Sequence, residues 1–215
     1  NKIESNKLDQ SNLKLISKNL IFTNSGEAII IKSDTSKGIV LRGYNNSDFS
    51  KLEIINNKTF IGDKNDLSKN FISIGKELSF DLNLKIGDNI TLMSSSGVET
   101  IIGSLPKQKT FTVKSLFESG LADFDKNIAF INLETLEEFF DLKKTDRNLE
   151  IFLKNPQSIE NQKKIVQNIF PDEFIYSCDA IFKKIRIKNF FSSFNIFTFS
   201  FSYSRHYIKS SGKKL

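Results

Sequence analysis

The sequence has few of the residue types from which catalytic sites are commonly built. It holds one cysteine, Cys178, and one histidine, His206, among 215 residues. A single cysteine excludes an intrachain disulfide, and it neither demands nor forbids an oxidising compartment. With only a distant histidine to activate it, Cys178 is a weak candidate for a nucleophile. We expect it to be a small apolar residue near the end of a strand.

Other motifs of catalysis and ligand binding are also missing. There is no G-x-x-x-x-G-K-[ST] loop, which argues against ATP binding. Glu118, Asp123 and Asp125 do not have the spacing of an EF-hand, so we expect a turn with solvated carboxylates. No second acidic cluster is placed opposite them, as paired-carboxylate hydrolysis would need. We therefore expect no enzyme activity, no metal and no cofactor.

Long apolar runs are absent too. No stretch of 18 uncharged apolar residues occurs, so no segment is expected to span a bilayer unaided. The sequence begins at Asn1, and no signal-peptide pattern precedes the first predicted strand. A fragment of a longer protein is the simpler expectation.

The positive charge of the chain is concentrated at one end. The net charge is +6, and residues 181–215 contain eight Lys and Arg and no acid, which leaves residues 1–180 at −2. A nucleic-acid-binding protein would spread its basic residues over a folded face, so we expect no nucleic-acid partner. The tail, rich in Phe and Ser, could be a degenerate membrane entry, an interfacial segment or a stretch translated out of frame.

Hydrophobic periodicity predicts an α+β fold. Strands are expected at 13–22, 28–31, 38–42, 89–93, 111–117, 127–132, 149–153 and 174–177, with a turn at 24–26. Helices are expected at 75–82, after Asn132 as N-cap, and after Asn155 with Pro156 at the first helical position. The acids Glu134, Glu137 and Glu138 are interpreted as a solvated face. Residues 1–45 and 126–180 would form a strand–helix–strand lobe, and residues 46–125 an inserted β-rich lobe.

The segment 94–110 is far longer than a hairpin turn requires, and long ordered loops are usually functional or mobile. Its apolar residues have no obvious core to enter, its proline stiffens the return, and its lysines could steer a partner. A plain surface excursion is the alternative. The candidate binding residues are Ile101, Ile102, Leu105, Pro106, Lys107 and Lys109.

Short motifs follow one another between residues 38 and 140, at 38–43, 74–78, 84–92, 105–107, 111–113, 117–120, 123–125, 129–131 and 136–140. Each motif alone is weak evidence, but their order and spacing make the combination fairly specific. Together they resemble the periplasmic domain of the lipoprotein-releasing ABC transporter permeases, the LolC/LolE family.

This resemblance implies a mechanical part of a transporter in the inner membrane, facing the periplasm, rather than a catalyst. It implies a porter-like lobe and a protruding hairpin, the hook, at residues 94–110. The implied partners are a LolA-like periplasmic chaperone, a LolD-like cytoplasmic ATPase subunit that hydrolyses the ATP, a second permease subunit and the lipoprotein cargo. The main alternative is a MacB-like or FtsX-like permease domain with a different periplasmic partner. An enzyme of unrecognised type is the third hypothesis.

Overall fold

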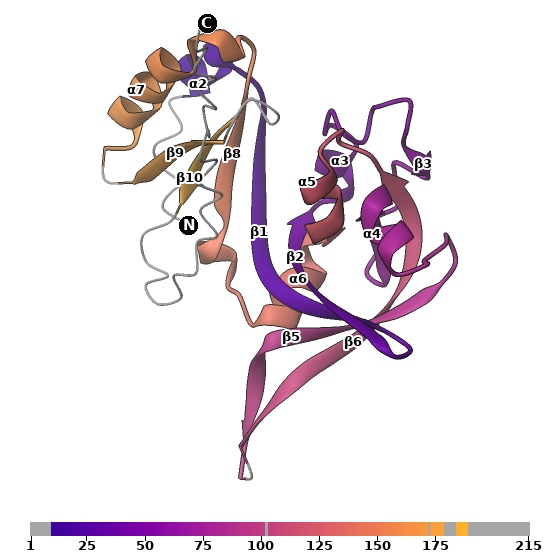
Figure 1. Ribbon diagram of the computed structural model, residues 1–215. Coiled ribbons are helices and arrows are strands. Elements are labelled where there is room, and N and C mark those ends of the chain that lie inside the picture. The colour runs from indigo at the N-terminus through magenta and orange to yellow at the C-terminus, as the bar shows by residue number, and fades with distance from the viewer. Residues whose placement is uncertain (1–9, 102, 172, 179–183, 189–215) are drawn as a thin grey trace, which may run out of the picture.

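The computed structural model describes residues 10–101, 103–171, 173–178 and 184–188 (Figure 1). Short helices alternate with ten strands in a mixed sheet, which confirms the α+β expectation. The first half of the chain contains α2 (Gln10–Ile16), β1 (Ser17–Lys32), β2 (Thr35–Tyr44), α3 (Asn46–Phe49), β3 (Ile61–Gly62), β4 (Phe71–Gly75), α4 (Lys76–Asp81) and β5 (Asn89–Thr100). The second half contains β6 (Gly103–Phe117), α5 (Ala122–Asn127), β7 (Ile128–Asn132), α6 (Leu133–Phe140), β8 (Asn148–Leu153), α7 (Ile159–Ile169), β9 (Phe174–Cys178) and β10 (Lys184–Lys188).

Six strands form a closed ring. β1 pairs with β2, β2 with β7, β7 with β4, β4 with β6, β6 with β5, and β5 returns to β1. Alternate side chains of a strand point to opposite faces, so one set fills the interior of the ring. α6 packs against this core through Leu136, Phe139 and Phe140. Buried residues from the strands include Ile30, Leu41, Ile72, Ile74, Leu92, Phe111, Val113 and Ile131.

The other half of β1 belongs to a second, outer lobe. Residues 17–23 pair with β8, and β8 continues through β10 to β9. Helices α2 and α7 lie beside this small sheet (Figure 1), and Leu13 and Val166 pack against Leu149 and Ile151 in its core. β1 is therefore one continuous strand shared by the ring and the outer lobe.

The strand pairing departs from the sequence-based expectations at several points. The predicted turn at 24–26 is wrong, because Asn24 and Gly26 lie inside β1 and pair with β2. Gly26 instead allows the Phe140 ring to lie close to the strand, since a Cβ at residue 26 would lie 2.6 Å from that ring. β4 and β10 were not predicted. The division into domains stays a prediction, although β2 and β7 pair within the same ring as β4.

Two ion pairs join the lobes at the middle of β1. Arg42 on β2 pairs with Glu150 on β8, and the Tyr44 hydroxyl donates to the same carboxylate at 3.0 Å. Glu150 is completely buried. Nearby, Glu137 on α6 accepts two bonds from the Arg147 guanidinium, at 2.6 and 2.8 Å. The expectation that Glu137 is solvated is thus wrong, since the tertiary fold supplies it with a cation.

Replacing Glu150 by Gln should destabilise the protein by about 3–5 kcal/mol, because Arg42 would be left as a buried charge without its partner. Glu53→Gln is the matched control. Glu53 is exposed and pairs with the exposed Lys18 at 3.4 Å, an interaction worth about 0–1 kcal/mol. Urea denaturation would measure both. Equal losses in the two variants would contradict the assigned role of Glu150.

Gly75, at the junction of β4 and α4, is a second point of close packing. A Cβ there would lie 2.0 Å from the Asp125 carbonyl oxygen. Asp125 is buried in α5 rather than solvated as expected, and both of its carboxylate oxygens accept from the Ser119 N–H at 3.0 Å. Burial raises the pKa of the Asp125 carboxyl, while the hydrogen bonds from Ser119 lower it part of the way back.

Gly75→Ala should cost about 3 kcal/mol or more of stability, because the obstacle is backbone and cannot rotate away. Gly38→Ala provides the control, since a Cβ at Gly38 meets no atom within 4 Å. Gly38→Ala should change the free energy of unfolding by less than about 0.5 kcal/mol. Thermal unfolding of the two variants side by side tests the expectation. An unchanged unfolding midpoint for Gly75→Ala would refute it.

Candidate functional site: the hook

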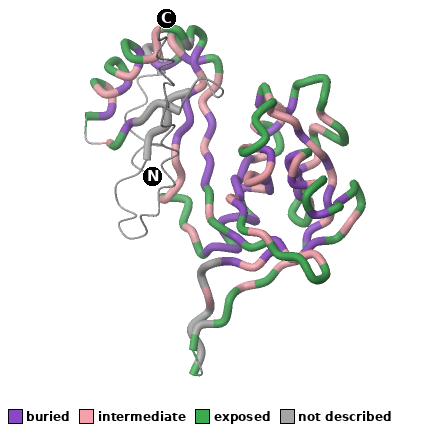
Figure 2. Tube along the Cα trace, in the orientation of Figure 1, coloured by how far each residue is buried: buried purple, intermediate pink, exposed green. Residues whose placement is uncertain are grey.

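The hook, residues 94–110, is a two-stranded ribbon rather than the long loop expected from its length. β5 continues outward to Thr100 and β6 returns from Gly103. Ser94 is the last residue of β5 that pairs with β1, opposite Ala28. Beyond this point the hook projects from the ring (Figure 1), and its described residues are mostly exposed or half-buried (Figure 2).

A bulge lies at the base of the hook. Met93 pairs with Gln108, whereas the next pair is Gly97 with Pro106. Three residues of β5, 94–96, thus stand opposite Lys107 alone. An excess of residues in one strand bends it and increases the local twist. β5 changes direction between the ring and the tip in Figure 1.

The end of the hook presents apolar side chains to solvent. Ile101 is fully exposed, and Leu105 is 53% exposed. Pro106 is also exposed. Ile102, the remaining apolar candidate, lies outside the described residues. Large aliphatic side chains held in water on an ordered ribbon have no structural use in the isolated domain, which marks the tip as a candidate contact surface.

The two predicted lysines are placed differently from the apolar residues. Lys107 Nζ lies 2.5 Å from Asp141 Oδ1 and donates to the Glu138 carbonyl at 3.3 Å. Lys109 Nζ lies 5.6 Å from the centre of the Phe111 ring. The contact with Asp141 was not predicted from the sequence, because no local pattern links residues 34 positions apart.

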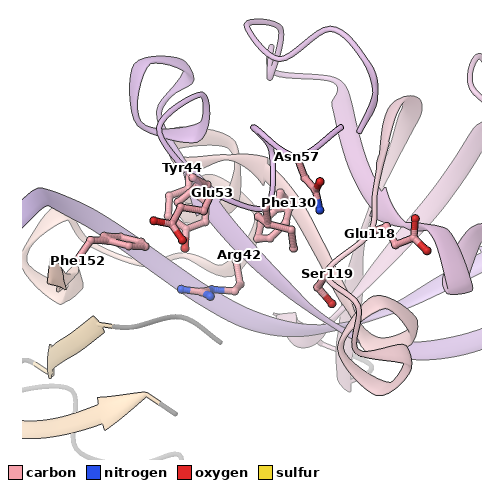
Figure 3. Close-up of a pocket in the computed structure, with 10 residues that line it drawn as sticks. Arg42, Tyr44, Glu53, Asn57, Glu118, Ser119, Phe130 and Phe152 are labelled. Carbon is pink, nitrogen blue, oxygen red and sulfur yellow. The ribbon is translucent and has the colours of Figure 1, made fainter. Parts of the chain in front are cut away.

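A hollow of about 200 Å³ lies between the lobes (Figure 3). Tyr44, Leu52, Glu53, Phe130 and Phe152 are among the residues that line it. Arg42 also contributes to its wall, and its guanidinium is already bonded to Glu150. Ser119 is also in the lining, and its hydroxyl donates to the Leu121 carbonyl at 3.3 Å.

Three further observations concern the sites considered from the sequence. Cys178 ends β9, and His206 lies outside the described residues. Across the ranges that the structure describes, no three His, Cys, Asp or Glu side chains gather as a metal site would require. Within the same ranges, no helix has the length and apolar character needed to cross a membrane.

Comparison with curated proteins shows similarity to a permease subunit. Residues of this chain match the lipoprotein-releasing system transmembrane protein LolC of Xylella fastidiosa, at 27% identity over 111 residues, and that of Neisseria meningitidis, at 26% over 136 residues. The sequence similarity is to LolC. This confirms the resemblance found from the motifs. The matches cover 51% and 62% of this chain, but only 27% and 33% of the LolC proteins.

The similarity to solved structures is weak. The extracellular domain of YknZ from Gram-positive bacteria gives a TM-score of 0.45 at 13% identity and covers 88% of this chain and 91% of its own. The periplasmic region of MacB from Actinobacillus actinomycetemcomitans gives 0.43 at 10% identity, with 78% and 77% covered. No family model matches the sequence.

The exposure of the tip predicts that it can be changed without harm to the fold. Ile101→Asp should alter the free energy of unfolding by less than about 0.5 kcal/mol, because the side chain has no buried contacts to lose. Phe111→Ala, in β6 where the hook joins the ring, should cost about 3–5 kcal/mol because Phe111 lies in the ring core. Urea denaturation distinguishes the two, and a destabilised Ile101→Asp variant would show that the tip packs against the domain.

Proposed function

We propose that this chain is the periplasmic domain of an ABC transporter permease that releases lipoproteins from the inner membrane. In this proposal the hook passes the cargo to a soluble periplasmic chaperone of the LolA type. The observation that carries it is the apolar tip, Ile101 and Leu105, held in solvent at the end of an ordered ribbon. The similarity to LolC supports the assignment of the domain to this kind of transporter.

The chemistry of the tip suits a transient handover. Burying one large aliphatic side chain contributes about 1.5–3 kcal/mol. Two such side chains contribute about 3–6 kcal/mol, and the loss of translational and rotational freedom on association offsets most or all of it, so the complex would be weak and would dissociate fast. Because the two strands of the ribbon are paired on both sides of the bulge, less chain entropy is lost on docking than for an open loop.

The remaining partners follow from the proposed transporter. ATP hydrolysis would occur in a separate LolD-like subunit in the cytoplasm, and the energy would reach this domain through the membrane part of the permease. A second permease subunit and the lipoprotein itself complete the assembly. The domain would act mechanically, facing the periplasm, with no chemistry of its own.

Ile101→Asp and Leu105→Asp should each lower the affinity for the periplasmic lipoprotein chaperone of the same organism by about tenfold or more, because a carboxylate would have to be buried in an apolar contact. Calorimetry or biolayer interferometry on the purified domain measures this. Thr59→Asp is a control with the same charge change, since Thr59 is exposed in the loop before β3.

Unchanged affinity in both tip variants would contradict the proposal, as would failure of the unmodified domain to bind the chaperone. If the domain instead binds a periplasmic adaptor or an activator of a cell-wall hydrolase, the function shifts to a MacB-like or FtsX-like permease.

A further inference from the structure

The hook is attached to the rest of the molecule by more than its own strands. Lys107 stands opposite the bulge, where the ribbon leaves the ring. From there its ammonium group reaches the C-terminal end of α6, where it contacts Asp141 and the Glu138 carbonyl. We name this set of contacts, Lys107 with Asp141 and Glu138, the brace. It rests on the scaffold, since α6 packs into the ring core.

The end of α6 is well suited to hold a cation. The last carbonyls of a helix have no partner within the helix, and they carry its negative partial charge. Asp141 is the residue that ends α6, in the left-handed conformation with φ 54°, and it adds a full negative charge at the same point. Lys107 is only 25% exposed there, whereas Asp141 is 67% exposed. The Lys107 side chain is thus partly covered by the scaffold, while its partner Asp141 is mostly in solvent.

From these contacts we propose that Lys107 and Asp141 are positioning residues: the brace sets the angle of the hook and thereby aims its apolar tip. This rests on the proposed function of the tip and assigns Lys107 a different role from steering a partner. A bulge is a natural bending point in a ribbon. Four residues separate Lys107 from Gly103, or about 13 Å, so a 10° rotation at the bulge would move the tip by about 2 Å.

The same helix connects the brace to the outer lobe. Glu137, the neighbour of Glu138 in α6, is bonded to Arg147 just before β8 and accepts from the Asn24 side chain at 3.2 Å. α6 therefore contacts the hook through the Glu138 carbonyl, and it contacts the lobe junction through the preceding residue, Glu137. Contacts with both lobes, and not with the ring strands alone, thus determine the angle of the hook.

The test measures the position of the hook relative to the ring, in the absence of any partner protein. Nitroxide labels at Ile101→Cys and Ser47→Cys, in a Cys178→Ser background, report the distance from the tip to α3. Asp141→Asn and Lys107→Met should broaden that distance distribution by about twofold. Asn tolerates the left-handed conformation of residue 141, so the helix end is preserved. Lys109→Met, which removes a hook lysine outside the brace, should leave the width unchanged.

Binding of the chaperone to the unlabelled domain separates positioning from steering. Without the brace, both Asp141→Asn and Lys107→Met should weaken binding by about two- to fivefold. If Lys107 steered an acidic partner, Asp141→Asn would make the hook more positive and strengthen binding. Unchanged distance distributions in both brace variants would overturn the inference even if the tip binds the chaperone. Broadened distributions with no chaperone binding would sustain the brace and reject the proposed function.

Discussion

The structure depends on one shared strand and the charges buried beside it. β1 runs through both lobes, and a single strand in that position could twist or bend between them. Arg42–Glu150 and Arg147–Glu137 lie on either side of this strand and connect β2 with β8 and α6 with the start of β8. Buried ion pairs of this kind add little net stability compared with apolar packing, but they are costly to separate. Their effect is to hold the lobes in one relative position.

A fixed junction gives the hook a defined direction. The ribbon leaves a closed ring, so its root is hydrogen-bonded on both sides up to Ser94. Past that residue, β5–β6 pairing and the brace restrain it. α6 takes part in both the junction and the brace, and it is also the helix that packs Phe139 and Phe140 into the ring. The tip proposed for contact is thus attached through α6 to the ring core.

Sequence patterns predicted the positions of most helices and strands, but not which residues contact them in the fold. Asn132 was expected to cap a helix, and its side chain accepts from the N–H groups of Glu134 and Thr135. The same patterns assigned Glu137 and Asp125 to solvent, because a carboxylate looks exposed until the fold brings Arg147 or the Ser119 N–H to it. Gly26 was taken for a turn, since glycine favours turns and gives no sign that an aromatic ring lies against it.

The sequence by itself determined the α+β class, the helix caps, the apolar tip at Ile101 and Leu105 and the motifs shared with LolC, because these depend on residues close together in the chain. Only the tertiary structure decided that strands close into a ring, that the segment 94–110 is a ribbon, and that Lys107 reaches Asp141. The ring and the Lys107–Asp141 contact join residues that are tens of positions apart, and no local preference specifies them. The ribbon pairs residues that are close in the chain, such as Thr100 with Gly103, but its serine- and glycine-rich start is also typical of a loop.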